Sequence, residues 1–343
     1  MASFATRLAS VSAAVWIGCA SGASPPPGGL ERLAAVPDPP AGHSWPAPPD
    51  VVEKVLAERR GEVRDRDPAP EGATHADRWK IYFPSIGRSI ELKWKPAPPG
   101  DADGFNNAPR KELAAYEVQK WFLGPEAYVV PTTVPRCIPV SAYRNLHSDG
   151  EPTLPGTQCV LGVEAVWLQH VEVPDVVYDP ARFWRDPVYA RHLANFNLLT
   201  YLVENRDTRK GNILVSTEPG NPRVFAVDNG IAFDSRLYNY FSDLLVNPWQ
   251  RILVPALPRD SIERLRAVTP ERAAQLAVVA QMQVDGAGLL HEAPPTAPID
   301  PTRGSRWRDG VFQLGLTRSE IDHVLGRVHA LLARVDRGEI PLF

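Results

Sequence analysis

Three polar residues near the middle of the chain, Asp207, Asn212 and Asp228, are spaced so that they could act together on a phosphate group through a divalent cation. Asp207 and Asn212 are five residues apart in a polar loop, and Asp228 follows the second of two β-branched runs, 213–215 and 224–227. The Glu-Pro-Gly-Asn-Pro stretch between these runs predicts a hairpin turn. A hairpin would bring both carboxylates and the amide to one edge, where a cation could bridge polyphosphate oxygens. Taken singly, each residue is more simply explained as a turn cap, so the prediction depends on their joint spacing.

This pattern resembles the catalytic core of protein-kinase-like enzymes, in which Asp-x-x-x-x-Asn is followed by a strand hairpin and Asp-x-Gly. The resemblance is closest to the atypical branch that includes HipA kinases, type II phosphatidylinositol 4-kinases and secreted Golgi casein kinases. It implies that Asp207 orients the acceptor hydroxyl and that Asn212 and Asp228 hold metal. Asn229 stands where protein kinases have Phe, and Asn205 stands where they have the catalytic-loop His. The protein kinases proper are therefore a poorer match.

Helices are expected on both sides of this hairpin. Asp186 and Pro187 can cap and begin a helix whose apolar residues recur at helical spacing up to Val203. That helix would deliver the chain to the polar loop. Beyond the hairpin, a stretch at 241–249 has no Ala-Pro-Glu motif, and the C-terminal part is then expected to be helical. Its sequence signals are capping-box spacings at Asp260/Glu263 and Thr317/Glu320 and a last apolar stripe from Ile321 to Val335 that ends at Gly338.

An antiparallel sheet is expected upstream. The runs 79–83 and 89–94 predict two strands joined by Pro84-Ser85-Ile86-Gly87. In a kinase-like lobe this turn would lie over the nucleotide phosphates, with the N–H groups near Ser85 and Gly87 as anion contacts. No Gly-x-Gly-x-x-Gly is present, so the turn alone is more simply read as a hairpin.

A phosphate-binding lysine is expected on the second of these strands. Lys93 and Lys95 share one face, and either could reach phosphate oxygens or stay solvated at a sheet edge. A helix over 109–123 follows, and Glu112 and Glu117 flank its apolar stripe, so helical geometry does not select the lysine's partner. The resemblance selects Lys95, because the related families carry Lys-Pro here. It also selects Glu112, because Glu-Leu-Ala-Ala-Tyr followed by Val-Pro-Thr resembles their Glu-x-Ala-Ala-x…Val-Pro-Pro pattern.

Two further strands are expected at 136–140 and 158–166, and they carry Cys137 and Cys159. In an oxidising compartment these cysteines would form a disulfide, although two reduced buried thiols fit almost as well. By its order in the chain, the segment 166–170 would connect two lobes and meet an adenine through backbone groups.

The first 23 residues resemble a signal peptide or lipoprotein leader. Arg7 precedes an apolar run that ends at Gly18 and is too short to span a bilayer. Trp-Ile-Gly-Cys then resembles a lipobox, so a lipidated Cys19 would tether the protein to a membrane. Cleavage after Ala23 is the competing prediction, and a cytosolic N-terminus is a third. Residues 24–76 are rich in proline and predict an extended tether with one short helix capped by Asp50.

The sequence as a whole predicts an α+β, two-lobed protein-kinase-like domain at 77–343. A small antiparallel β lobe at about 78–168 would precede a larger, mainly helical lobe at about 169–343. The resemblance implies transfer of the γ-phosphoryl group of ATP, with Mg²⁺ or Mn²⁺, to a hydroxyl of an unknown protein, lipid or sugar. An exported, inactive pseudokinase-like binding module is the alternative. The net charge of −3 gives no electrostatic footprint for nucleic acid, and zinc-ligand spacings, a Walker A loop and a Gly-x-Ser-x-Gly elbow are missing from the sequence.

Overall fold

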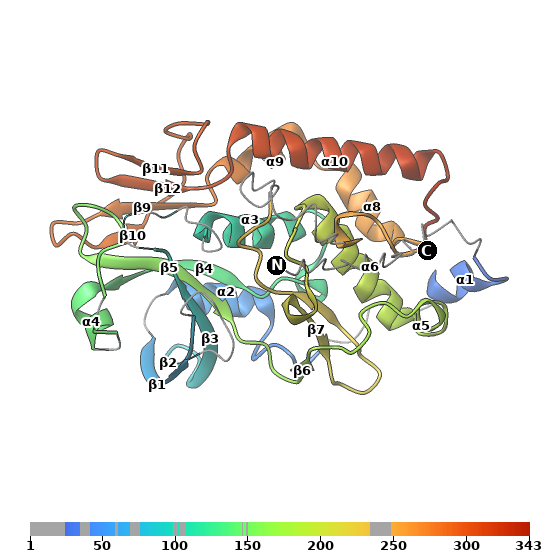
Figure 1. The fold of residues 1–343 in the computed structure, drawn as a ribbon, viewed down its shortest axis with the longest axis horizontal. Coiled ribbons are helices and arrows are strands. Elements are labelled where there is room, and N and C mark those ends of the chain that lie inside the picture. Colours follow the sequence, from blue (N-terminus) through green and yellow to red (C-terminus); the bar gives the residue numbers. More distant parts are fainter. Residues whose placement is uncertain are drawn as a thin grey trace, which may run out of the picture.

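Helices and antiparallel sheets form two lobes in this computed structural model, which confirms the predicted α+β class (Figure 1). The structure describes residues 25–34, 42–58, 61–68, 76–98, 100, 102, 108–145, 147–148, 150–233 and 248–343. The proposed leader, including Cys19, and most of the stretch at 241–249 lie outside these residues. No described helix is both long enough and apolar enough to cross a bilayer.

The small lobe is built on a five-stranded sheet with the order β1-β2-β3-β5-β4, and all its neighbours are antiparallel. The strands are β1 (Glu62–Pro68), β2 (Asp77–Phe83), β3 (Arg88–Pro96), β4 (Thr133–Pro139) and β5 (Cys159–Val166). Alternate side chains of β2 and β3 face the core, and Trp79 stacks on Trp94 with ring centroids 5.3 Å apart. The strands predicted around these two tryptophans are confirmed.

Two helices accompany this sheet, α3 (Pro109–Gln119) and the short α4 (Val140–Arg144). Pro109 occupies the first turn of α3, as predicted, because its missing N–H would lack a helical partner in any case. The helix ends at Gln119 rather than at Leu123, and turns follow.

The large lobe contains the long helix α6 and the hairpin that follows it. Asp186 caps α6 by accepting a hydrogen bond from the Tyr189 N–H at 3.0 Å, as its position predicted. The elements here are α5 (Pro180–Arg185), α6 (Pro187–Leu202), α8 (Arg259–Arg266), α9 (Pro270–Ala274), α10 (Arg318–Asp336) and a sheet of β6 (Val171–Glu172), β7 (Ile213–Ser216) and β8 (Val224–Ala226). Short 3-10 helices lie at Pro125–Ala127, Lys210–Asn212, Pro248–Gln250 and Gln275–Ala277.

The two capping-box predictions had different outcomes. Thr317 and Glu320 form the reciprocal pair at the start of α10, with N–H to side-chain oxygen distances of 2.8 and 3.2 Å. Asp260 does not cap α8, because that helix already begins at Arg259 after Pro258.

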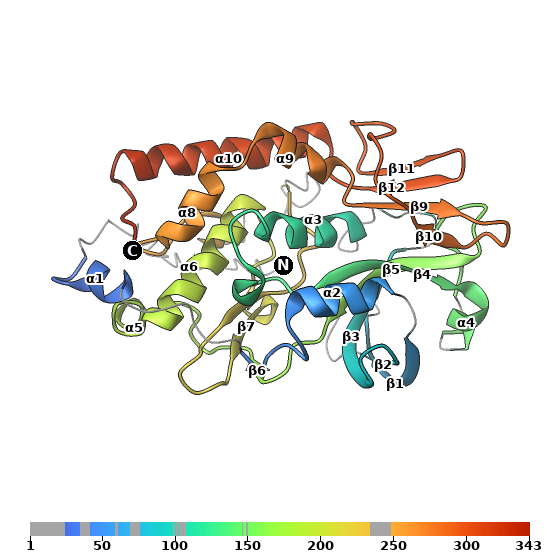
Figure 2. The ribbon, with the colours of Figure 1, turned by 180° about the vertical axis from the view of Figure 1, so that it is seen from behind.

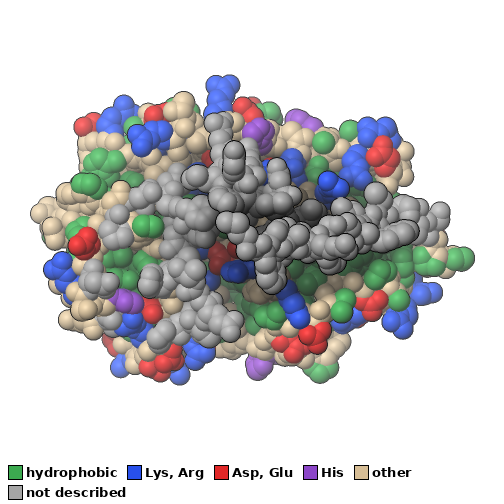
Figure 3. Space-filling model, in the orientation of Figure 1, with side chains coloured by type: hydrophobic (Ala, Val, Ile, Leu, Met, Phe, Trp, Pro, Cys, Tyr) green, Lys and Arg blue, Asp and Glu red, His purple; other side chains and the backbone are tan. Residues whose placement is uncertain are grey.

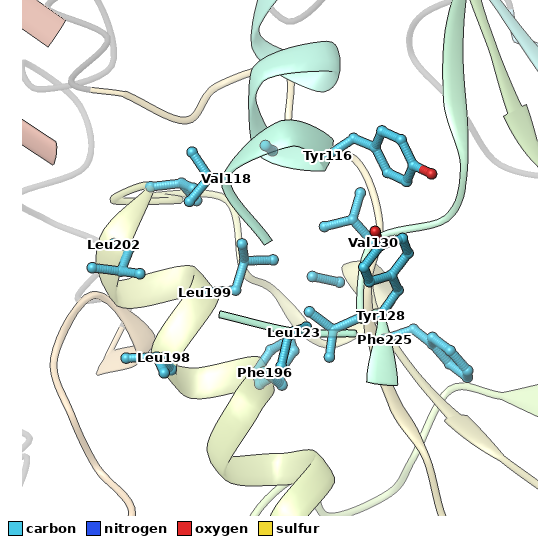
Figure 4. Close-up of a cluster of buried hydrophobic side chains, with 14 of the residues drawn as sticks. Tyr116, Val118, Leu123, Tyr128, Val130, Phe196, Leu198, Leu199, Leu202 and Phe225 are labelled. Atoms are coloured by element: carbon cyan, nitrogen blue, oxygen red, sulfur yellow. The ribbon is translucent and has the colours of Figure 1, made fainter. Parts of the chain in front are cut away.

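A shared apolar core joins the two lobes. Side chains from α3 and the turn after it meet side chains from α6 and β8 (Figure 4). The labelled members include Tyr116, Val118, Leu123, Phe196, Leu199, Leu202 and Phe225. Burial of these groups fixes α3 relative to the helix that leads into the polar loop.

The segment 24–76, predicted to be an extended tether with one short helix, packs on the domain in the part that the structure describes. Helix α1 (Gly29–Ala34) lies beside α5 and α6, α2 (Pro49–Ala57) lies against α3 and β4, and β1 joins the sheet (Figure 1). Leu33, Trp45 and Leu56 are buried in the main core. We call the described part of residues 24–76 the N-terminal strap. The Gln169 N–H donates to the Ser44 carbonyl at 2.9 Å, so the strap also contacts the segment between the lobes.

The prolines keep the connections of the strap extended, whereas apolar residues between the prolines are buried against the domain. Helix α2 begins at Pro49, and Asp50 lies in its first turn without acting as the cap.

The expectation of a helical C-terminal part is also corrected. Residues 280–314 form a four-stranded sheet with the order β10-β9-β12-β11 (Figure 2). Its strands are β9 (Ala280–Val284), β10 (Leu290–Glu292), β11 (Ser305–Arg308) and β12 (Val311–Leu314). Met282, Phe312 and Leu314 pack with Leu113 of α3 and Leu161 of β5, so this sheet covers the small lobe. The strands have three to five residues, which is too short for their alternation to stand out in the sequence.

The predicted disulfide between Cys137 and Cys159 is present and links β4 to β5 with a Cα–Cα distance of 5.5 Å. The Leu290 N–H donates to the Cys137 sulfur at 3.3 Å, which places β10 against the bridge. On the described surface in Figure 3, Lys and Arg side chains are interspersed with Asp and Glu.

Candidate active site

A cleft of about 800 Å³ lies between the two lobes. It is lined by β3, α3 and β5 on one side and by the polar loop and the hairpin on the other. The predicted residues Lys95, Glu112, Asp207, Asn212 and Asp228 all line it. Five residues that are spread over 134 positions of sequence therefore meet in one cavity.

Lys95 is paired with two carboxylates at the centre of the cleft. Its Nζ donates to Oε1 of Glu112 at 2.9 Å and to Oδ1 of Asp228 at 2.5 Å. Burial by itself would lower the pKa of Lys95, but Glu112 and Asp228 outweigh burial and raise it above the ordinary value. The lysine therefore stays a cation in a position that is only 4% exposed.

The structure distinguishes between the candidate lysines and between the candidate glutamates. Lys93 lies 3.8 Å from Oδ2 of Asp228 and is more exposed, whereas Lys95 makes the pair with the helix. Glu117 instead pairs with Lys120 at 2.7 Å, one turn along α3. Gly162 in β5 makes room for this arrangement, because a Cβ there would stand 2.5 Å from the Lys95 carbonyl oxygen.

Asp228 follows β8 in a left-handed backbone conformation, with φ of 62°. Such a conformation is uncommon for a residue other than glycine and occurs often at functional sites. Burial would raise the pKa of Asp228, but Lys95 and then Lys93 outweigh it and lower the pKa. The carboxylate is thus ionised and ready to bind a cation.

Asp207 and Asn212 are held together inside the polar loop. The Asn212 Nδ2 donates to the Asp207 carbonyl at 2.7 Å and to its Oδ2 at 3.0 Å. These bonds leave Oδ1 of Asn212 as the atom that could bind a metal. The Val227 N–H donates to the Asn212 carbonyl at 3.0 Å, which ties the loop to the residue before Asp228. The hairpin prediction is confirmed in this detail.

The environment of Asp207 suits a group that accepts a proton. Burial raises its pKa, Arg209 opposes that rise, and Asp228 adds to it. Nε of Arg209 lies 3.6 Å from Oδ1 of Asp207, and Arg209 also lines the cleft. The sequence prediction did not include Arg209, although its position two residues after Asp207 was a signal that could have found it.

The donor set fits a hard divalent cation. The Asp228 carboxylate and the Asn212 amide are oxygen ligands, and Mg²⁺ commonly binds one or two such groups and completes its shell with phosphate oxygens and water. Within the described ranges, no group of three or more His, Cys, Asp or Glu residues could hold a metal by itself.

The turn that was assigned to the phosphates does not line the cleft. Neither Ser85 nor Gly87 is among the residues that line the cleft. Arg88, where β3 begins, is seven residues before Lys95. A strand rises about 3.3 Å per residue, so the turn lies on the order of 20 Å from Lys95.

The β2–β3 register shows which end of these two strands lies at the cleft. Asp77 pairs with Trp94, beside Lys95, and Ala76 lines the cleft. The residues that lead into Ala76 from β1, 69–75, lie outside the described residues. The sequence prediction did not include Ala76 among the site residues, because residues 24–76 were assigned to the tether.

The segment between the lobes is placed as its order in the chain predicted. All five of its residues line the cleft: Val166, Trp167, Leu168, Gln169 and His170. The Trp167 N–H donates to the Glu91 carbonyl of β3 at 2.9 Å, so the segment is anchored to the small lobe.

Comparison with known proteins supports the fold. No protein-family model matches the sequence, and no curated protein matches it either. Among solved structures, the chain is similar to hydra Fam20, determined with sugar, at 14% sequence identity and a TM-score of 0.50. The match covers 86% of this chain and 93% of that one. The chain therefore has an atypical protein-kinase-like fold, as the motifs predicted, and the likeness at this identity concerns the fold alone.

Proposed function

We propose that this protein is a metal- and ATP-dependent phosphotransferase that acts on a hydroxyl group. The convergence of Lys95, Glu112, Asp207, Asn212 and Asp228 in one cleft supports the proposal most directly. A fold alone does not carry a function, but these residues have the types and the contacts that phosphoryl transfer requires.

Each residue has a distinct role in this proposal. Lys95, held by Glu112, binds phosphate oxygens as a fixed cation, and Lys93 adds positive charge beside Asp228. Asp228 and Asn212 hold Mg²⁺ or Mn²⁺, which would neutralise phosphate charge when bound. Asp207 orients the acceptor hydroxyl and accepts its proton, for which its raised pKa is suited.

The acceptor and the location are proposals of the same kind. The hydra Fam20 structure was determined with sugar, so sugar acceptors belong beside protein and lipid acceptors in any screen. The disulfide supports export to an oxidising compartment. Export through residues 1–23, with or without a lipid on Cys19, can be checked by intact mass of protein from its native host. Recovery of unprocessed Met1 would contradict export.

Two aspartate variants test the proposed function. Asp228→Ala should lose both metal-dependent nucleotide binding and turnover, because it removes a metal ligand. Asp207→Ala should bind Mg-ATP or Mn-ATP nearly as the wild type does, yet lose turnover by at least ~10²-fold. Asp260→Ala, which removes a half-exposed carboxylate on α8, is the matched control and should change neither quantity.

The measurements are ATP affinity by calorimetry and phosphoryl transfer to protein, lipid and sugar acceptors, with each metal in turn. The proposal is wrong if the wild type binds no nucleotide with either metal. Binding without turnover on all three acceptor classes would instead favour the pseudokinase-like binding module.

A further inference from the structure

Asn205 and Asn229 are the two positions at which the site departs from protein kinases, and they are hydrogen-bonded to each other. Nδ2 of Asn205 donates to Oδ1 of Asn229 at 2.9 Å. Both side chains are 1% exposed, although they are 24 residues apart in the sequence. One residue belongs to the loop that carries Asp207, and the other follows Asp228. The two residues that differ from the protein-kinase pattern therefore form a single hydrogen-bonded contact.

This contact lies within a longer hydrogen-bonded chain. The Asp207 N–H donates to Oδ1 of Asn205 at 3.0 Å. At the other end, the Asn229 N–H donates to Oε2 of Glu112 at 2.9 Å, and Oε1 of Glu112 accepts from Lys95. The chain thus runs without a break from the backbone of Asp207 to the ammonium group of Lys95.

The direction of each bond in the chain is fixed. A backbone N–H can only donate, so Asn205 must present Oδ1 to Asp207. Its Nδ2 then faces Asn229, which must present Oδ1 in turn. The amide orientations follow from the network, and neither asparagine can rotate its amide without losing a buried bond.

We propose that Asn205 and Asn229 are positioning residues that hold the acceptor-orienting Asp207 in register with the Lys95–Glu112 pair. This inference rests on the proposed function. A directional amide pair joins the loop that carries Asp207 to the residue that follows Asp228. Displacement of a reacting group by about 1 Å can cost on the order of 10²-fold in rate, so such a link has catalytic consequences.

Substitution by leucine, which is similar in size to asparagine, breaks the link. Asn229→Leu removes the acceptor that Nδ2 of Asn205 uses across the link but keeps the backbone bond to Glu112. We expect kcat to fall at least about tenfold while the Kd for Mg-ATP stays within about threefold. In the double variant Asn205→Leu/Asn229→Leu, both partners are apolar, so stability should partly return. The kcat of the double variant should lie within about threefold of that of the worse single variant, because the two residues act as one unit.

Asn195→Leu is the matched control. Asn195 is also 1% exposed, lies on α6, and accepts a hydrogen bond from Ser261 Oγ at 2.9 Å. Loss of this hydrogen bond in Asn195→Leu should lower the melting temperature without changing kcat. The proposal is overturned if Asn205→Leu and Asn229→Leu keep kcat within about threefold of wild type, or if their effects on kcat simply multiply. If Asn205→Leu does not fold, Asn229→Leu and Asn229→Ala carry the test.

A second readout does not depend on the proposed function. Hydrogen exchange at the Asp207 amide reports the bond to Asn205 directly, with or without catalysis. Asn229→Leu should speed exchange in a peptide covering 205–209, because Asn205 loses the partner that fixes its orientation. Unchanged exchange there would overturn the proposal. A wild type that transfers no phosphate, combined with faster exchange in Asn229→Leu, would reject the proposed function and keep the amide link.

Discussion

Arg110 on α3 forms an ion pair with Glu320 at the start of α10, with a distance of 2.8 Å between Nη1 and Oε2. Both side chains are nearly buried, at 8% and 12% exposure. Glu320 also completes the capping box with Thr317. The pair therefore connects the C-terminal helix to the helix that carries Glu112. Gly304 permits the contact, because a Cβ there would overlap the guanidinium of Arg110.

Breaking this pair should destabilise the protein strongly. Arg110→Met leaves Glu320 without its buried cation, a change that typically costs about 3–5 kcal/mol. The double variant Arg110→Met/Glu320→Met should recover much of that loss. The exposed pair Arg266–Asp336 is the matched control, and Arg266→Met should change stability far less than Arg110→Met does. Urea unfolding measures all four proteins. A small effect of Arg110→Met would mean that the pair does not hold α3.

The two lysines of β3 should differ in their importance. Lys95→Met removes a buried cation between two carboxylates, so we expect turnover to fall by about 10²-fold and nucleotide binding to weaken. Lys93→Met removes a longer and more exposed contact to Asp228, at 3.8 Å, and should have the smaller effect. Titration of Mg-ATP into both variants compares them. A larger loss of affinity for Lys93→Met would reverse the assignment.

Asp207 should make stability depend on pH in a defined direction. Its pKa is raised in the folded state by burial. The carboxyl of Asp207 therefore ionises more readily in the unfolded chain than in the folded protein. Its protonated form stabilises the fold below the ordinary pKa of 3.8, and this stabilisation is lost as pH rises through the folded pKa. Asp207→Asn should thus melt at a higher temperature than wild type at neutral pH, without metal or nucleotide.

The difference in melting temperature should shrink as pH falls and should be smallest below 3.8, where the wild-type carboxyl is mostly protonated in both states. Thermal unfolding between pH 3.5 and 8 measures this. An Asp207→Asn variant that is less stable than wild type at pH 7 would contradict the prediction.

The disulfide should contribute to stability through the 22-residue separation that it closes. For a loop of this length the contribution is about 3 kcal/mol. We expect Cys137→Ala/Cys159→Ala to lose roughly that amount of unfolding free energy and to become insensitive to reductant. Chemical unfolding with and without dithiothreitol checks both points. Quantitative alkylation of both cysteines in unreduced protein would show that the bond does not form.

The sequence by itself predicted that three of the site residues lie together, because their positions are set by local spacing. Asp207, Asn212 and Asp228 belong to one loop and the hairpin that follows it, so the turn residues between the strands suffice to bring them together. The start of α6 at Asp186 and the start of α10 at Thr317 are local in the same way, because a cap depends on only the first few residues of its helix.

Tertiary structure alone decided how distant segments meet. Packing placed the N-terminal strap on the domain and the sheet at 280–314 on the small lobe, and neither segment carries a periodic pattern long enough to reveal its partner. It placed Ala76, and not the turn at Ser85, at the cleft, because the β2–β3 register fixes which end of the strands faces the cleft. Tertiary structure also brought Asn205 and Asn229, the two departures from the kinase pattern, within hydrogen-bonding distance of each other. A hydrogen bond between residues 24 positions apart depends on three-dimensional proximity, which local sequence preferences do not encode.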